Sequence, residues 1–352
     1  MRAPRVSIGM PVWNSNPGYF QAALDGVLAQ DFQDFEIIMS DNGSHESARA
    51  MFEEAAKRDP RIRLHRHEKN RGGSWNMRFV LDQAQGELFM WAADDDLRSP
   101  QMLSHLVDAL DRHPTCVTAA SHVAIIDENG KRTRGQDMGT AHVGSASPAR
   151  RLLNMLTTHS PNIDLYGLHR RQMIQELDFG IPNLWLDMHM TMDVLLHGPI
   201  ARVEGELFSY RISAGLDESY ARRLYQVFGD DARPTESPAQ AKAGHEAYAG
   251  ANYSETAFSL LSYLLRSRAK MSDVQRMECF AVLAAILTAR GWFTRNELVR
   301  VVPALKRAID ERSIARSAQL AARLVLASPS FPFVAGAYKI SQIFSQLQGA
   351  RR

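Results

Sequence analysis

The sequence LFMWAADDD at residues 88–96 sets the architecture that we expect for this chain. Its apolar part is long enough to predict a buried strand. Asp94, Asp95 and Asp96 then stand at the carboxyl end of that strand. Three adjacent carboxylates repel one another, so they destabilise the fold unless a positive group neutralises them. We therefore expect a divalent cation with oxygen ligands here, itself bound to a diphosphate. The alternative is an acidic turn that caps the helix beginning at Pro100.

Strands and helices alternate along the first part of the sequence. Apolar and β-branched runs predict the strands, and apolar residues at helical spacing predict the helices. The predicted strands cover residues 6–12, 35–39, 61–67 and 88–93, and the predicted helices cover residues 19–30, 74–85 and 100–113, with a further helix that ends at residue 58. Strands joined by helices of this length form a doubly wound parallel sheet. The carboxyl ends of such strands bind ligands, so the aspartates stand at the expected binding edge.

The pattern changes after residue 115, and we divide the chain into three parts. A strand at 116–126, a helix at 185–197 and two short strands at 200–203 and 206–211 continue the first domain. A stretch rich in Pro, Gly and Ala follows, and helical patterns then continue to the end of the sequence. The predicted parts are an α/β domain over residues 1–225 with halves 1–115 and 116–225, a linker over 226–250, and a helical domain over 251–352.

The composition is typical of a globular protein in a reducing compartment. Of the 352 residues, 45% are hydrophobic, which is enough for a sizeable core. The net charge of +2 does not indicate a nucleic-acid-binding protein, and two cysteines make no disulfide framework. No apolar signal region precedes the first predicted strand. We therefore expect a cytoplasmic protein without nucleic acid as a partner.

The end of the chain is basic and partly apolar. No acidic residue follows Glu311, whereas arginines, a lysine and large apolar side chains do. A basic, apolar helical tail could dock on an anionic membrane surface, which would make the protein peripheral at the inner face of the cell membrane. The alternative is a solvated helix that packs on its own domain.

Five short motifs, in order along the chain, carry a resemblance to a known family. They are VSIGMPVWN at 6–14, FEIIMSDNGS at 35–44, NRGGSWN at 70–76, AQGE at 84–87 and DDDLRSP at 94–100. Over about residues 5–212 the chain resembles the family 2 glycosyltransferases. The resemblance implies a GT-A-type fold, in which a doubly wound, mostly parallel sheet is flanked by helices; here a C-terminal helical region follows. It further implies that the half 1–115 binds nucleotide and the half 116–225 binds acceptor.

The resemblance assigns a nucleotide-sugar donor, which we expect to be a UDP-sugar, to the early loops. Trp13 would stack on the base, and Asp41 would accept a hydrogen bond from a base imide N–H. Arg71 stands beside two glycines, where a guanidinium and backbone amides could meet phosphate. The alternatives are a turn-forming role for Asp41 and a solvated loop position for Arg71. The implied donor-binding residues are Pro11, Trp13, Asn14, Asp41, Asn70, Arg71, Asp94 and Asp95.

The same resemblance assigns the metal site when the motifs are aligned on Pro100. Asp95 and Asp96 then take the positions of the family's adjacent acidic pair, so Asp96 is the implied metal ligand and Asp95 a ribose or metal contact. The family often has an acidic residue where Ala93 stands, so the assignment of Asp94 rests on a variable position. Mg²⁺ or Mn²⁺ would neutralise the diphosphate and stabilise it as it leaves.

An inverting transfer also needs a general base near the acceptor hydroxyl. In the family this base is an acidic residue eleven positions before a glycine that precedes the strand leading to a Tyr-Arg pair. Asp187 has this spacing from Gly198, and Tyr210 begins the pair. Asp193, on the same predicted helix, is the alternative base, although a solvated helix carboxylate is the commoner explanation of such a residue.

The function that the sequence indicates is inverting transfer of a sugar from a nucleotide-diphosphate donor to an acceptor hydroxyl. The resemblance implies an acceptor in a surface polysaccharide or a lipid-linked glycan, and it leaves open whether the chain forms a homo-oligomer. One alternative is a sensor or scaffold that binds nucleotide sugar without turnover. A second is a sugar nucleotidyltransferase, but its Gly-rich loop with Arg and Lys is replaced here by WNSN at 13–16.

Overall fold

The computed structural model describes residues 2–136, 147–157, 163–177, 186–212, 260, 263–264 and 267–289. The chain forms two compact units. The first comprises Met1–Gly144, Asn162–Val194 and Gly198–Glu246, and the second comprises Ser145–Pro161, Leu195–His197 and Ala247–Arg352. The predicted boundary at residue 225, the linker over 226–250 and the basic tail after Glu311 lie outside the described residues, so these stay predictions.

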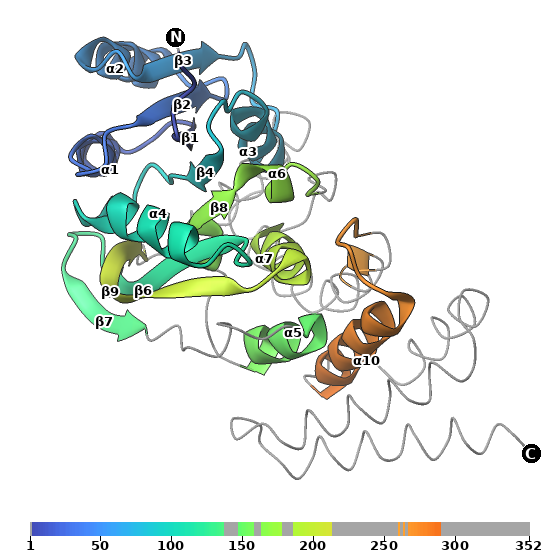
Figure 1. Ribbon diagram of the computed structural model, residues 1–352. Helices are drawn as coiled ribbons and strands as arrows, with labels where there is room; N and C mark the ends of the chain where they lie inside the picture. The colour runs from blue at the N-terminus through green and yellow to red at the C-terminus, as the bar shows by residue number, and fades with distance from the viewer. Residues whose placement is uncertain are drawn as a thin grey trace, which may run out of the picture. The chain divides into compact units, whose positions relative to one another are not determined.

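Nine strands of the described residues form one sheet in the order β3-β2-β1-β4-β8-β6-β9-β5, with β7 paired to β6 (Figure 1). The strands are β1 Val6–Val12, β2 Phe35–Asp41, β3 Ile62–Arg66, β4 Leu88–Trp91, β5 Leu97–Arg98, β6 Thr118–Ile126, β7 Arg132–Gln136, β8 Leu168–Arg170 and β9 Ile200–Arg211. The helices of the sheet unit are α1 Pro17–Leu28, α2 Glu46–Arg58, α3 Gly73–Asp82, α4 Met102–Arg112, the 3₁₀ turn η1 Ile163–Tyr166, α6 Arg171–Ile174 and α7 Leu186–His197. In the other unit, α5 Pro148–Thr157 packs against α10 Asp273–Ala289.

The sheet is parallel where the sequence predicted it and mixed beyond. β3, β2, β1 and β4 run parallel, and each follows the alternation of strand and helix in the sequence. The short strand β8 then joins β4 and β6 antiparallel to both. The GT-A-type α/β architecture is confirmed, with a mixed rather than uniform second half.

One predicted break in the sheet is absent. The segments expected as two short strands, 200–203 and 206–211, form the single strand β9. Its pairing with β6 shifts register around His122, and Gly205 in β9 has a φ of 92°. A glycine in this conformation accommodates a bulge without ending the strand. The sequence signal of a turn therefore marks an irregularity within one strand.

Two hydrophobic clusters fill the two sides of the sheet, because successive strand residues face opposite ways. In β4, for example, Met90 belongs to one cluster and Trp91 to the other. Helices α1, α2 and α4 cover the first side, and α3, α6 and α7 cover the second (Figure 1). Helices on both faces bury the central strands β1, β2 and β4 almost throughout, which explains their mainly apolar sequences, whereas β3 at the edge stays partly exposed.

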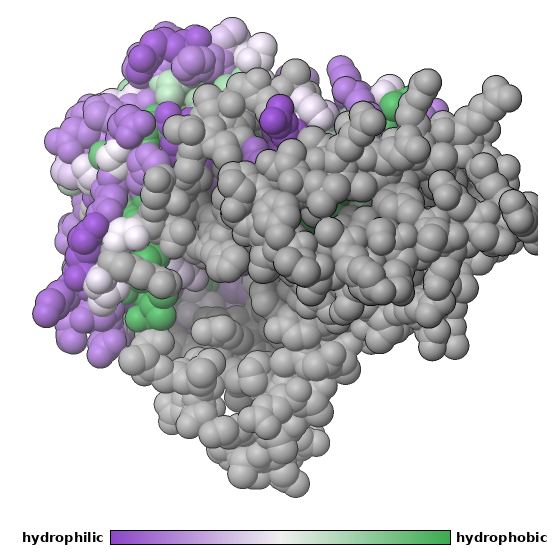
Figure 2. Space-filling model, turned by 90° about the horizontal axis from the view of Figure 1, so that it is seen from below, coloured by the Kyte–Doolittle hydropathy of each residue, from purple (hydrophilic) through white to green (hydrophobic). Residues whose placement is uncertain are grey.

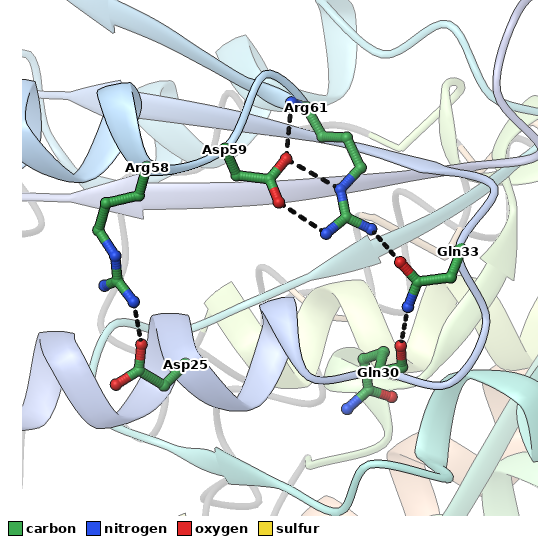
Figure 3. A network of polar contacts seen from close by, with 6 residues as sticks. All are labelled: Asp25, Gln30, Gln33, Arg58, Asp59 and Arg61. Carbon is green, nitrogen blue, oxygen red and sulfur yellow. Dashed lines mark hydrogen bonds and ion pairs between the residues drawn. The ribbon is translucent and has the colours of Figure 1, made fainter.

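A polar network links the ends of α1 and α2 to the start of β3 (Figure 3). Arg61 makes a two-pronged ion pair with Asp59, at 2.9 Å from Nε and 2.7 Å from Nη2, and it donates from Nη1 to Gln33 at 2.9 Å. The Gln33 amide donates in turn to the Gln30 carbonyl. The network therefore fixes the edge of the sheet next to β2.

We expect Arg61→Met to lower the free energy of unfolding by about 1 kcal/mol, because a partly exposed two-pronged pair contributes about that much. Arg66→Met is the matched control, since Arg66 at the end of β3 pairs with Glu53 of α2 at a more exposed position. Urea unfolding of both variants checks this, and an Arg61 variant no less stable than the Arg66 variant would contradict it.

The described surface is mainly polar on the face seen in Figure 2, where hydrophobic side chains form only small groups. Among the described residues, the large hydrophobic side chains that are exposed are Ile212 and Val274. Within the described part of the chain, no helix has both the length and the apolar character needed to span a bilayer.

Candidate active site

The candidate site is built from loops that follow the parallel strands at one edge of the sheet. β1 and β2 end side by side, with Val12 opposite Asp41. β4 lies on the other side of β1 and leads into the acidic loop, and the Ala92 N–H donates to the Gly9 carbonyl at 2.8 Å. The structure thus brings the first, second and fifth motifs together at the edge where α/β sheets bind ligands.

Asn14 joins the loop after β1 to the loop after β2. Its backbone N–H donates to Ser44 Oγ at 2.9 Å, and its side-chain Oδ1 accepts from the His45 N–H at 2.8 Å. These two bonds hold Asn14 at a φ of 46°, which asparagine tolerates better than most residues. Trp13, just before it, and Pro11, in β1, are both partly buried. Asn14 therefore sets the position of the loop that carries Trp13.

Asp41 is the last residue of β2, and one of its two carboxylate oxygens makes no hydrogen bond with the described residues. The side chain is 1% exposed, and its Oδ1 accepts from the Ser44 N–H at 3.0 Å. Its Oδ2 is buried and has no hydrogen-bond partner among the described residues. A buried acceptor without a partner is costly, so this oxygen is suited to an N–H donor of a bound molecule.

The loop before α3 packs on the loop after β2 through paired amides. The Asn42 amide donates to Asn70 Oδ1 at 2.8 Å, and Asn42 Oδ1 accepts from the Arg71 N–H at 3.0 Å. Gly43, with a φ of 77°, permits the contact, because a Cβ there would lie 2.4 Å from the Lys69 carbonyl carbon. Asn70 is thus buried as a structural link.

Arg71 leaves that loop with its guanidinium on an aromatic ring. Its Cζ lies 4.0 Å from the centre of the Trp75 ring, which stacks in turn on Phe79. The His67 ring lies edge-on to the Trp75 ring, with the ring centres 4.7 Å apart, and the His67 backbone N–H donates to the Asp41 carbonyl. The arginine is therefore held above an aromatic cluster beside Asp41.

The acidic loop is bound to β9 and to the loop after β1. The Arg211 N–H donates to Asp96 Oδ1 at 2.8 Å, and Arg211 Nε donates to the Asp95 carbonyl at 2.7 Å. Ser15 donates its hydroxyl to Asp94. Arg98 is buried and directs its guanidinium at the Asp96 carbonyl. The guanidinium groups of Arg98 and Arg211 thus donate to backbone carbonyls rather than to the Asp96 carboxylate.

The Asp96 carboxylate is buried in an electrostatically unfavourable environment. It is 1% exposed, and its Oδ2 has no hydrogen-bond partner among the described residues. Burial, followed by the negative charge of Asp95, raises the pKa of Asp96 to about 8; Arg211 and Arg98 oppose the rise, and Asp94 adds to it. A bound cation would relieve this by replacing the proton.

The donor set suits a cation that is shared with a substrate. Within the described part of the chain, no group of three His, Cys, Asp or Glu side chains is arranged to hold a metal. Mg²⁺ in nucleotide sites is typically held by one or two carboxylates, with phosphate and water as the other ligands. Asp96 Oδ2, which has no partner among the described residues, and the neighbouring Asp95 fit this arrangement.

The raised pKa predicts how metal binding changes with pH. Asp96 in the unfolded chain titrates near pH 4, so between about pH 4 and 8 the folded chain holds an extra proton and the metal-free protein loses stability as pH rises. A metal must displace that proton, so Mn²⁺ affinity in the presence of UDP should rise up to about tenfold per pH unit below pH 8. Calorimetry at pH 6, 7 and 8 measures this. An affinity that does not change with pH would contradict it, and Asp96→Asn should show a much weaker dependence.

The two candidate bases both lie on α7 and differ in their exposure to solvent. Asp187 lies in the first turn and is exposed, and its Oδ1 accepts from the Met188 N–H at 2.8 Å. Asp193 is 1% exposed, so the expectation of a solvated carboxylate at that position is wrong. The charge of Asp96 and, as the smallest contribution, that of Asp187 both raise the pKa of Tyr166. An exposed carboxylate is the easier one for an acceptor to reach.

The roles of some site residues were not predicted from the sequence. Asn42 stands inside a motif, yet its role as the link between two loops depends on a contact 28 residues away. Arg98 follows the aspartates by two positions, and its burial gives no sequence signal. Ser15 and Tyr166 carry no recognisable motif. These residues act through contacts that only the folded chain brings about.

Comparison with known proteins identifies the family of the N-terminal half. Residues 7–177 match the model of Glycosyl transferase family 2. An uncharacterized glycosyltransferase of Rickettsia felis is 29% identical over 134 residues, 37% of this chain and 21% of that protein. A GalNAc(5)-diNAcBac-PP-undecaprenol beta-1,3-glucosyltransferase of Campylobacter jejuni is 32% identical over 94 residues, 26% of this chain and 30% of that protein. The chain thus spans about a fifth to a third of the length of these relatives.

Solved structures share the fold. Residues 1–349 of TarS from S. aureus, solved in complex with UDP-GlcNAc, match with a TM-score of 0.56 and 16% sequence identity, over 92% of this chain and 82% of that one. At this identity the likeness establishes the GT-A-type architecture alone.

Proposed function

Because residues 7–177 form a glycosyl transferase family 2 domain, we propose that this chain transfers a sugar from a nucleotide-diphosphate donor to an acceptor hydroxyl with inversion. The observation that carries the proposal is a pair of buried carboxylate oxygens, on Asp41 and Asp96, that have no partner among the described residues and lie at the ligand-binding edge of one sheet. One oxygen suits an N–H donor and the other suits a cation. A nucleoside diphosphate with its metal supplies both.

The donor would lie across the early loops. Asp41 would accept from the imide N–H of a uracil-type base, with Pro11, Trp13 and Asn14 beside it. The cationic Arg71 and the loop of Asn70 would face the donor's phosphates or base. A UDP-sugar is the donor class that we propose, and the UDP-GlcNAc bound by TarS supports that choice.

Asp96 would hold Mg²⁺ or Mn²⁺, Asp95 would contact the metal or the ribose, and Asp94 would border the donor. When bound, the metal neutralises the diphosphate and so makes it a better leaving group. Asp96 would contribute its Oδ2, which makes no hydrogen bond within the described part of the chain. Arg211 holds the other oxygen of Asp96 through its backbone N–H, which fixes the direction of the carboxylate.

Asp187 would act as the base. Its carboxylate takes the proton of the acceptor hydroxyl, and the acceptor oxygen forms a bond to the anomeric carbon from the side opposite the diphosphate. The bond between that carbon and the diphosphate oxygen breaks, and its electron pair leaves with the diphosphate. Attack from the opposite side inverts the anomeric configuration.

The acceptor would be a glycan or a lipid-linked saccharide in the synthesis of a surface polysaccharide. The Campylobacter jejuni relative is named for a polyprenyl-diphosphate-linked acceptor, and that supports a lipid-linked one here. Reaction on such an acceptor would fit a cytoplasmic protein that is peripheral at the inner face of the membrane, and the basic tail after Glu311 would supply the contact.

A panel of UDP-, GDP-, TDP- and CMP-sugars with Mn²⁺ tests the function. We expect slow hydrolysis of the true donor without acceptor, since the same site can accept water. Tight binding without hydrolysis or transfer to any acceptor would favour the sensor. Release of pyrophosphate from a nucleoside triphosphate and a sugar phosphate would favour the nucleotidyltransferase.

A further inference from the structure

Tyr166 ends η1, a turn that is held at several points but carries none of the residues assigned so far. Asp164 in the same turn makes a two-pronged ion pair with Arg202, at 2.7 and 3.1 Å. The Arg202 side chain is 1% exposed, so this pair is buried and its loss would be strongly destabilising. One end of the turn is thereby fixed to β9.

A buried histidine fixes the next residue of the turn. His169 donates from Nε2 to the Leu165 carbonyl at 2.8 Å, and its Nδ1 accepts from the Thr118 hydroxyl at 2.8 Å. Burial lowers the pKa of His169 to about 4, so the ring is neutral and can accept at one nitrogen while it donates at the other. The turn is thereby joined to β6.

Gly167 allows the chain after the turn to approach β6 closely. A Cβ at Gly167 would lie 2.5 Å from the Ala119 carbonyl oxygen, which no side chain permits. The ion pair, the histidine and the glycine together place Tyr166 with little freedom. A turn held this firmly presents its last side chain in one orientation.

The Tyr166 ring lies against the strand that holds the acidic loop. It stacks on Phe208 of β9, with ring centres 5.6 Å apart and an angle of 29° between the planes. Phe208 pairs with Arg98, and the Arg98 guanidinium lies 5.2 Å from the Phe208 ring centre. Since Arg211, further along β9, binds Asp96, the Tyr166 ring shares its support with the proposed metal ligand.

The Tyr166 hydroxyl remains available for a ligand. Tyr166 is partly exposed, and its hydroxyl is not among the buried polar atoms that lack a partner in the described part of the chain. Burial, then the charge of Asp96, and further the influence of Tyr210, Asp95 and Asp187 raise the pKa of Tyr166 well above its usual value. The hydroxyl therefore keeps its proton and stands within the fields of both the acidic loop and the proposed base.

We propose that the Tyr166 hydroxyl donates a hydrogen bond to the monosaccharide that is being transferred. This rests on the proposed function, in which the diphosphate is bound at Asp96 and the acceptor at Asp187, so that the transferred sugar lies between them. A sugar presents hydroxyl oxygens that accept such a bond, and a neutral donor is the appropriate partner among carboxylates. Tyr166 is thus a specificity-determining residue for the sugar rather than for the nucleotide.

Calorimetry with Tyr166→Phe tests this, because the variant keeps the ring and its stack on Phe208. The probes are UDP and UDP-GlcNAc with Mn²⁺, or the corresponding pair for whichever donor the wild type selects from the panel. We expect affinity for the nucleotide sugar to fall about five- to twentyfold and affinity for the nucleoside diphosphate to stay within twofold. kcat/KM for transfer should fall about tenfold or more.

Tyr263→Phe is the matched control, since Tyr263 belongs to the other compact unit, and it should leave both affinities unchanged. Unchanged nucleotide-sugar affinity and transfer in Tyr166→Phe would overturn the inference. So would an equal loss of affinity for both probes, because that indicates a contact to the diphosphate or a structural role. Failure of the wild type to bind or turn over any nucleotide sugar would instead overturn the proposed function itself.

Discussion

Asp96→Asn is expected to lower the affinity for a nucleoside diphosphate in the presence of Mn²⁺ by at least a hundredfold, about 3 kcal/mol. Asparagine keeps the size of the side chain and can still accept from the Arg211 N–H. It removes the negative charge that a divalent cation needs, and Asp95 alone would then have to hold the metal. Calorimetry with UDP, with and without Mn²⁺, measures the effect, and transfer activity should fall below detection.

The same substitution should make the metal-free protein more stable at high pH. The Asp96 carboxylate is destabilising when it is ionised, because it is buried beside Asp95. Asparagine cannot ionise, so the melting temperature of the variant at pH 9 should equal or exceed that of the wild type. Asp25→Asn is the control, since Asp25 is a surface carboxylate paired with Arg58. Unaltered Mn²⁺-dependent affinity in Asp96→Asn would remove the metal role from this residue.

The sequence was sufficient for the parallel half of the sheet because its signals are local. β1, β2 and β4 are mainly apolar runs bounded by loops, β3 places Ile62 and Leu64 between charged or polar residues, and each strand is separated from the next by a segment of helical period. The candidate site could be predicted for the same reason, since Asp41 is the last residue of β2 and the acidic loop follows β4. Neighbours in such a sheet can be expected from chain order alone.

The second half was harder to predict because its contacts are distant along the chain. β8 has three residues, too few for a periodic pattern, yet it joins β4 to β6. The position of Tyr166 depends on Arg202 and on His169, and neither contact leaves a pattern in the sequence. The burial of Asp193 could not be predicted from the sequence either, because α7 has no clear polar face.

Asp187→Asn is expected to lower kcat for transfer by about 10²–10⁴-fold, the range typical of a general base, and to leave donor affinity within twofold. Asparagine keeps the shape of the side chain and its capacity to accept from the Met188 N–H, so α7 should begin as before. It cannot take the proton of the acceptor hydroxyl. Steady-state kinetics with the acceptor, together with calorimetry of the donor, separate the two quantities.

Asp193→Asn is the matched comparison, because Asp193 lies on the same helix but is buried. A buried carboxylate serves the fold, so this variant should lose thermal stability while the folded fraction keeps its kcat. If Asp187→Asn retains full activity and Asp193→Asn loses it without a change in melting temperature, the base is Asp193. A parallel fall of donor affinity and kcat in Asp187→Asn would mean that Asp187 binds the donor, since a base that acts only on the acceptor leaves the donor complex intact.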